Sequence, residues 1–193
     1  EKEAIIYFGG NAEAVFYNAQ HFLDTFPDHT IYLLNYRGYG GSSGQPSEQG
    51  FFKDALFLFD NVLEKHTIIS VIGRSLGSGV ATYLASKRSV KKMALISPFD
   101  SITSVAQKKF MIFPVFLMLL DKYNSVSRVK GITAQTIALV AENDEVIPRV
   151  HSQRLIDEFP VGQVTVKIIG DSRHNDISEK VEYYQILKDF FSK

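Results

Sequence analysis

One serine stands in a context suited to nucleophilic chemistry. Ser75 is the centre of the motif GRSLG at 73–77, which follows the apolar run 67–72 and opens the helix-like stretch 76–87. A sharp strand-to-helix turn of this kind exposes the serine oxygen, and its glycines allow the helix to cross close to the strands. The start of the helix also offers free N–H groups to a developing oxyanion. The pattern therefore predicts that Ser75 is a nucleophile.

A serine hydroxyl is a poor nucleophile near neutral pH, so it needs a base and an acid that orients the base. Of the five histidines, only His174 lies in a loop directly after a predicted strand, and it is the expected general base. The loop 141–148 offers three carboxylates, of which Asp144 is the expected orienting acid. Asp100, which follows an earlier strand, is the alternative acid. The expected chain order is Ser75, Asp144, His174.

Two backbone N–H groups are expected to bind the oxyanion. One belongs to Leu76, which follows the nucleophile. The other belongs to Asn11, in a glycine-rich turn after the first predicted strand, where glycine lets the backbone approach a substrate closely. This chemistry needs no cofactor. No metal ion is expected either, because no group of His and carboxylate residues has ligand spacing.

Alternating strands and helices must position these residues. The predicted strands are 4–8, 30–35, 67–72, 92–97, 135–141 and 163–169. The predicted helices are 14–26, 47–65 with Ser47 as its N-cap, 76–87, 149–158 and 176–191. The strands are continuously apolar, which is typical of a parallel sheet covered by helices on both faces. In such a sheet the site lies beyond the carboxyl ends of the strands, where all the candidate residues fall.

The composition limits the class of protein. The chain has 193 residues, of which 45% are hydrophobic and 22% charged, so we expect one globular domain. Lys+Arg and Asp+Glu balance at 21 each, so a nucleic-acid partner is not expected. The absence of cysteine excludes disulfides, thiolate ligands and a cysteine nucleophile. The chain begins with Glu rather than Met, so we expect a trimmed N-terminus. The sequence therefore leaves the localisation open between a cytoplasmic protein and, if an N-terminal anchor has been trimmed, a membrane-associated one.

The segment 101–134, between the fourth and fifth predicted strands, interrupts the alternation. It is long for a simple crossover, and we expect a helical, cap-like insertion near the site. Its apolar run 110–120 is too short to span a bilayer. The run favours a lipid-like acyl substrate or contact with a membrane surface. The alternative is ordinary packing of a helix against the sheet edge.

Five motifs come in order along the chain: GNA at 10–12, YRGYGGSSG at 36–44, GRSLG at 73–77, NDxVxP at 143–148 and HND at 174–176. Together they resemble the α/β-hydrolase superfamily, and most of all its small Bem46-like and prolyl-oligopeptidase-like serine hydrolases. The resemblance covers nearly the whole chain. It implies a single three-layer α/β domain over 1–193, with a mainly parallel six-stranded sheet in spatial order 2-1-3-4-5-6. It also implies that two leading antiparallel strands are absent or trimmed.

The chain departs from the family pattern at two places. His-Gly often precedes the oxyanion residue, but Gly9-Gly10 stands here, and the second strand ends in Asn35 where Asp is common. Arg74 either lines the mouth of the site or pairs with a neighbouring acid. The motifs predict a serine hydrolase that cleaves an ester, thioester or short peptidyl substrate through an acyl-enzyme on Ser75. The alternative is a catalytically inactive binding or scaffold protein on the same fold.

Overall fold

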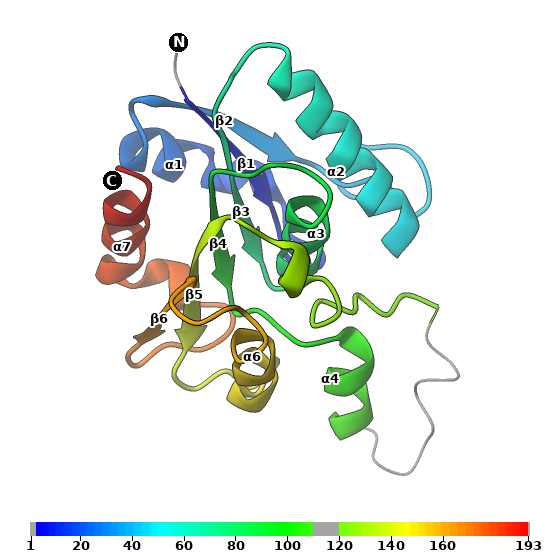
Figure 1. The fold of residues 1–193 in the computed structure, drawn as a ribbon, viewed down its shortest axis with the longest axis vertical. Helices are drawn as coiled ribbons and strands as arrows, with labels where there is room; N and C mark the ends of the chain where they lie inside the picture. Colours follow the sequence, from blue (N-terminus) through cyan, green and yellow to red (C-terminus); the bar gives the residue numbers. More distant parts are fainter. Residues whose placement is uncertain (1–2, 110–119, 193) are drawn as a thin grey trace.

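The computed structural model describes residues 3–109 and 120–192 (Figure 1). In this part of the chain six parallel strands form a sheet in the order β2-β1-β3-β4-β5-β6, which confirms the expected topology. The strands are β1 Glu3–Phe8, β2 His29–Leu34, β3 Ile69–Arg74, β4 Lys92–Ile96, β5 Gln135–Ala141 and β6 Val164–Ile169. The described α-helices are α1 Ala19–Thr25, α2 Glu48–Leu63, α3 Leu76–Ala85, α4 Ile102–Lys109, α6 Arg149–Ile156 and α7 Val181–Phe191.

Helices cover the sheet on both faces, so the fold has three layers (Figure 1). In β1, Ala4 and Ile6 belong to the core that α2 and α3 cover. Ile5 and Tyr7 belong to the core on the other face, with side chains of α1 and α7. Burial on both faces explains why the central strands are apolar at successive positions rather than at alternate ones.

The outer strand β6 differs from this expectation. Val166 and Ile168 are 39% and 44% exposed, because β6 pairs only with β5 and forms one edge of the sheet. Two predicted helices are also shorter than expected. The helix predicted over 14–26 begins with a 3₁₀ turn, Val15–Asn18, before α1. The one predicted over 176–191 is divided into a 3₁₀ turn, Ile177–Glu179, and α7.

The expected insertion begins with α4, directly after the β4 loop. Residues 110–119 of its apolar run lie outside the described part of the chain, so the proposed contact of this run with lipid stays a prediction. Beyond it, Arg128 forms an ion pair of 3.0 Å with Glu48 at the start of α2. Ser47 caps that helix as predicted, because its Oγ accepts a hydrogen bond from the Gly50 amide at 3.1 Å. None of the described helices is long and apolar enough to cross a bilayer.

Candidate active site

Ser75 lies at the turn between β3 and α3, with φ of 49° and ψ of −117°. A non-glycine residue rarely adopts positive φ, and such strain is typical of functional turns. The two glycines of the motif are required because a side chain at either position would collide with the backbone. A Cβ atom on Gly77 would collide with the carbonyl oxygen of Phe8, and one on Gly73 would collide with that of Gly77. The turn therefore brings the start of α3 against the end of β1.

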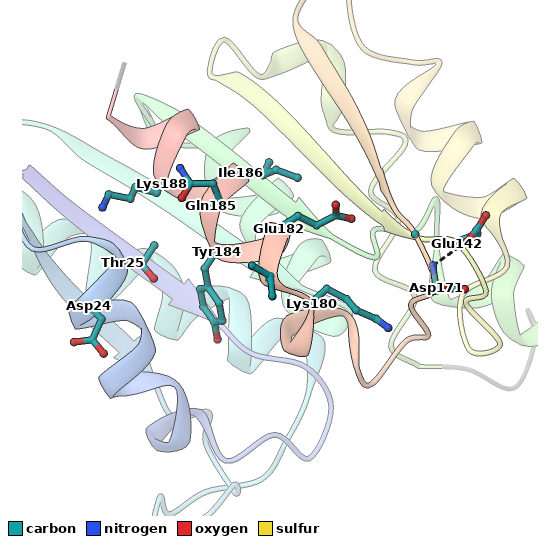
Figure 2. A pocket seen from close by; sticks show the side chains of 12 residues that line it. Asp24, Thr25, Glu142, Asp171, Lys180, Glu182, Tyr184, Gln185, Ile186 and Lys188 are labelled. Carbon is teal, nitrogen blue, oxygen red and sulfur yellow. Dashed lines mark hydrogen bonds between the residues drawn. The ribbon is translucent and has the colours of Figure 1, made fainter.

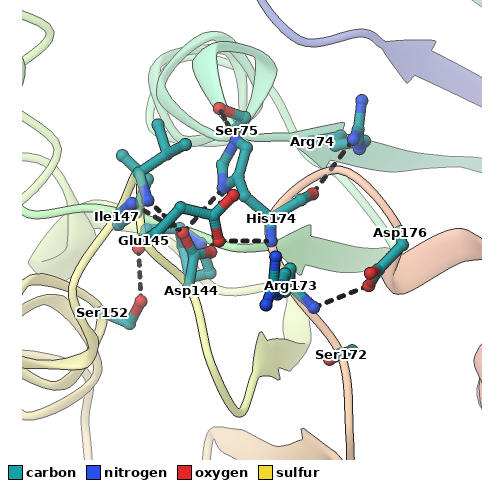
Figure 3. Close-up of polar contacts among 12 residues, drawn as sticks. Arg74, Ser75, Asp144, Glu145, Ile147, Ser152, Ser172, Arg173, His174 and Asp176 are labelled. Carbon is teal, nitrogen blue, oxygen red and sulfur yellow. Dashed lines mark hydrogen bonds and ion pairs between the residues drawn. The ribbon is translucent and has the colours of Figure 1, made fainter.

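The structure brings together Ser75, His174 and Asp144, which lie far apart in the chain (Figure 3). Ser75 Oγ is 2.9 Å from Nε2 of His174. Nδ1 of the same ring is 2.9 Å from Oδ2 of Asp144 and 3.0 Å from Oδ1. The His174 and Asp144 side chains are 7% and 1% exposed. This arrangement can deprotonate a serine and stabilise the charge that forms on the imidazole.

Backbone amides hold the carboxylate of Asp144 in place. Its Oδ1 accepts hydrogen bonds from the amides of Val146 at 3.0 Å and Ile147 at 2.7 Å. Burial opposes ionisation of Asp144, but the hydrogen bond with His174 and the one from Ile147 outweigh burial. The pKa of this carboxyl therefore lies below its usual value. The loop after β5 thus keeps an ionised acid beside the histidine.

The alternative acid, Asp100, has another partner. Its Oδ1 lies 3.0 Å from Nδ1 of His151, and both side chains are buried. Oδ2 of Asp100 lies 3.5 Å from the guanidinium of Arg154. The geometry therefore favours Asp144 over Asp100 as the acid that orients His174.

The candidate oxyanion donors lie on two sides of the serine. Leu76 is the first residue of α3, and the turn that contains Asn11 approaches Ser75, because a Cβ on Gly10 would lie 3.6 Å from that of Ser75. Within the described part of the chain, neither the Leu76 amide nor the Asn11 amide donates a hydrogen bond. The Gly10 amide is occupied, since it donates to Glu13. The assignment of Leu76 and Asn11 stays a prediction that this geometry permits.

Sequence analysis did not find Glu13. Its carboxylate accepts hydrogen bonds from the Gly10 amide at 2.5 Å and from Arg74 Nη1 at 2.9 Å. Arg74 thus pairs with an acid, which is one of the two roles considered for it. An acid three residues after a glycine in a tight turn is a recurrent way to satisfy free amides, and this spacing is the signal that was available.

Two surface pockets can be compared with the triad. Figure 2 shows one whose lining includes Asp24 of α1, Tyr184 of α7 and Glu142, which accepts a hydrogen bond from the Asp171 amide at 2.9 Å. None of the three triad residues is among its described lining residues. A second groove runs along Asn11, Phe16 and Tyr39, and so it adjoins a candidate oxyanion donor. The triad residues are absent from the described lining of this groove as well, but its contact with Asn11 makes it the better candidate of the two for receiving a substrate.

Among residues 3–109 and 120–192, no group of three or more His, Cys, Asp or Glu side chains is arranged to hold a metal ion.

Proteins of several organisms are similar in sequence to this chain. An uncharacterized protein of Mycobacterium tuberculosis, Rv2307c, is 33% identical over 153 residues, which are 76% of this chain and 53% of that protein. Lysophosphatidylserine lipase ABHD12 of Macaca fascicularis is 31% identical over 192 residues, covering 84% of this chain and 48% of that one. Protein bem46 of Schizosaccharomyces pombe is 24% identical over 213 residues, or 100% and 68% of the two chains. The chain spans about half the length of the first two.

Solved structures and family membership agree. The enzyme MGS-M2, an alpha/beta hydrolase from a deep-sea metagenome library, superposes with a TM-score of 0.79 at 14% identity, over 100% of this chain and 90% of that one. At this low identity, the similarity of the two structures shows the fold alone. A sequence model of the alpha/beta hydrolase fold matches residues 4–123. With more than half of the chain matched, this protein belongs to the α/β-hydrolase superfamily, as its motifs implied.

Proposed function

We propose that this chain is a serine hydrolase that cleaves an ester, thioester or short peptidyl bond through an acyl-enzyme on Ser75. One observation carries the proposal: Ser75, His174 and Asp144 form a continuous hydrogen-bonded chain at a strained strand-to-helix turn. A scaffold protein has no need of this arrangement, which includes a buried ionised acid and a backbone conformation that is unfavourable for serine.

The proposed reaction has two halves. Ser75 Oγ attacks the acyl carbonyl carbon while Nε2 of His174 takes the hydroxyl proton. The oxygen of the tetrahedral intermediate accepts hydrogen bonds from the Leu76 and Asn11 amides. The bond to the leaving group then breaks, and His174 gives its proton to that group. Water then attacks the carbonyl carbon of the acyl-enzyme while Nε2 of His174 takes a proton from the water. The bond from this carbon to Ser75 Oγ breaks, His174 gives the proton to Ser75 Oγ, and the carboxylic acid product departs.

The substrate class is proposed from two observations. ABHD12, which is 31% identical to this chain, is named a lysophosphatidylserine lipase. The groove beside Asn11 is lined in part by apolar side chains, including Phe16, which is 78% exposed. Both favour an ester with an apolar acyl chain. A lipid-facing role for the run 110–120 remains part of this proposal.

Labelling with a fluorophosphonate tests the proposal directly. We expect one adduct, located at Ser75 by mass spectrometry, because such probes react with activated serines. Labelling should be lost in Ser75→Ala and in His174→Ala. Ser127→Ala, which changes an exposed serine outside the site, is the matched control and should label as the wild type does. A folded wild-type protein that never labels would favour the alternative of an inactive scaffold.

A further inference from the structure

A second polar network lies next to the triad and is centred on Glu13. Its Oε1 accepts hydrogen bonds from the Tyr7 hydroxyl at 2.6 Å and from Asn18 Nδ2 at 2.7 Å. Its Oε2 accepts from the Gly10 amide at 2.5 Å and from Arg74 Nη1 at 2.9 Å. Four groups from different parts of the N-terminal half and from β3 thus converge on one carboxylate. Such a carboxylate determines the position of each group that it binds.

Arg74 extends this network to the catalytic histidine. While Nη1 contacts Glu13, Nη2 donates a hydrogen bond to the backbone carbonyl of His174 at 3.2 Å (Figure 3). Arg74 also directly precedes Ser75 in the chain. One guanidinium therefore connects three parts of the site: the turn after β1, the nucleophile turn and the loop that carries His174.

We infer that the Glu13–Arg74 ion pair is a positioning element, which holds the oxyanion turn and the His174 loop in register with Ser75. The inference rests on the proposed function, because it concerns the efficiency of that same site. Neither residue is catalytic in the sense of touching the reacting atoms. Both act on backbone atoms next to those that do, namely the amide beside Asn11 and the carbonyl of His174. A displacement of about 1 Å at such groups can lower a rate about 100-fold.

Burial and charge support this role. The Arg74 and Glu13 side chains are only 15% and 13% exposed. Burial alone raises the pKa of Glu13, but hydrogen bonds from Tyr7 and Gly10 and the charge of Arg74 outweigh burial and hold that pKa below its usual value. Glu13 therefore stays ionised, and its bond to the guanidinium is charge-assisted.

The geometry also fits positioning better than stability alone. Arg74 Nε is buried and has no hydrogen-bond partner within the described residues, which is unfavourable for folding. The two Nη groups nevertheless point in two separate directions, one to Glu13 and one to His174. The planar fork of arginine presents a separate nitrogen to each partner, whereas a lysine would have to reach both from one nitrogen on a differently shaped side chain.

Four variants separate positioning from folding. Arg74→Met and Glu13→Gln each break the pair, Arg74→Lys keeps the charge without the fork, and the double variant Glu13→Gln/Arg74→Met leaves no unpaired charge. For each we would measure the fluorophosphonate labelling rate, kcat and KM for p-nitrophenyl butyrate, and the Tm. We expect Arg74→Met to lower kcat and the labelling rate about 10- to 100-fold, with KM changed less than about threefold.

The remaining variants separate the effect of the pair on the reaction rate from its effect on stability. Arg74→Lys should recover the Tm but not kcat, because it cannot also hold the His174 carbonyl. The double variant should be more stable than either single one, since no buried charge is left unpaired, and yet stay slow. Arg88→Met breaks an ion pair of 2.7 Å with Asp60 at the surface and is the matched control, which should react as the wild type does.

Two outcomes distinguish the inference from the proposed function. If the wild type never labels, the proposed function fails and the inference with it. If the wild type labels at Ser75 but Arg74→Lys or the double variant labels equally fast, only the inference is overturned, and the pair serves stability alone.

Discussion

At the scale of single residues, the two oxygens of Asp144 differ in their backbone contacts. Oδ1 accepts hydrogen bonds from the amides of Val146 and Ile147. Both oxygens also lie close to Nδ1 of His174, Oδ2 at 2.9 Å and Oδ1 at 3.0 Å. The amides require an acceptor at Oδ1, so they determine which way an amide side chain would turn at this position. This asymmetry makes the role of the acid testable with a substitution that hardly changes its shape.

Asp144→Asn should retain the fold and lose most activity. The two amides would keep the carbonyl oxygen of the new side chain, so its NH₂ group would face Nδ1 of His174. The imidazole would then carry its proton on Nε2, toward Ser75, and would no longer accept the serine proton. We expect kcat for ester hydrolysis to fall about 10³- to 10⁴-fold with little change in KM. Asp100→Asn, at the other buried Asp–His pair, is the control and should keep kcat within about threefold. Equal losses in the two variants would contradict the assignment.

Glu13 should leave a signature in the pH dependence of stability. Its pKa is lowered in the folded protein, so its ionisation stabilises the fold above the unfolded pKa of about 4.3. That contribution is lost as the pH falls through the folded pKa. Glu13→Gln lacks this titration. We therefore expect the difference in Tm between wild type and variant to be largest near pH 7 and to narrow below about pH 4.3. Thermal unfolding of both proteins between pH 7 and pH 3 measures this difference in Tm. A difference that stays constant or widens as the pH falls would show that the pKa of Glu13 is not lowered in the folded protein.

At the scale of elements, the close approach of α3 to β1 affects both sides of the proposed oxyanion site. Gly77 lies where a Cβ would collide with the carbonyl oxygen of Phe8 and would come within 2.6 Å of that of Gly9. The two amides proposed to bind the oxyanion belong to these same two elements: Leu76 begins α3, and Asn11 follows β1. A change in their spacing therefore changes the distance between the donors.

Gly77→Ala should damage stability and activity together. We expect it to lower the free energy of unfolding by about 1–3 kcal/mol, because both contacts are with backbone that cannot turn aside. The labelling rate at Ser75 should fall in the fraction that remains folded. Gly131→Ala is the matched control, since a Cβ there meets no atom within 4 Å and the residue lies outside the proposed site. Differential scanning calorimetry and fluorophosphonate labelling are the measurements, and a Gly77→Ala protein with wild-type values would show that the approach is not required.

The residues that follow the strands could be predicted from the sequence, whereas contacts between loops could not. Ser75, Asp144 and His174 each follow a predicted strand, so a parallel sheet gathers them whatever the details of packing. The Glu13–Arg74 pair depends on how a turn approaches a strand 61 positions away, which no local pattern encodes. Likewise the exposure of Val166 and Ile168 in β6 follows from the place of this strand at the edge of the sheet, which its own sequence does not determine.

At the scale of the whole molecule, we expect a substrate to enter along the groove beside the turn after β1. The groove along Asn11, Phe16 and Tyr39 lies beside the proposed oxyanion donor Asn11, whose Oδ1 accepts a hydrogen bond of 2.5 Å from the Tyr39 hydroxyl. An acyl chain that lies in this groove would bury apolar surface against Phe16. The sheet, the turn after β1 and the loop 36–44 would then bind the substrate jointly.

A series of p-nitrophenyl esters tests this arrangement. Each methylene that becomes buried contributes about 0.8 kcal/mol, so kcat/KM should rise up to about fourfold per methylene from acetyl toward octanoyl. Phe16→Ser should flatten this rise and leave acetyl hydrolysis nearly unchanged, because the shortest chain does not reach the groove. Phe57→Ser, at a similarly exposed phenylalanine on α2 outside the groove, is the control and should keep the full rise. If acetyl is the best substrate, or if the two variants respond alike, the acyl chain does not lie in this groove.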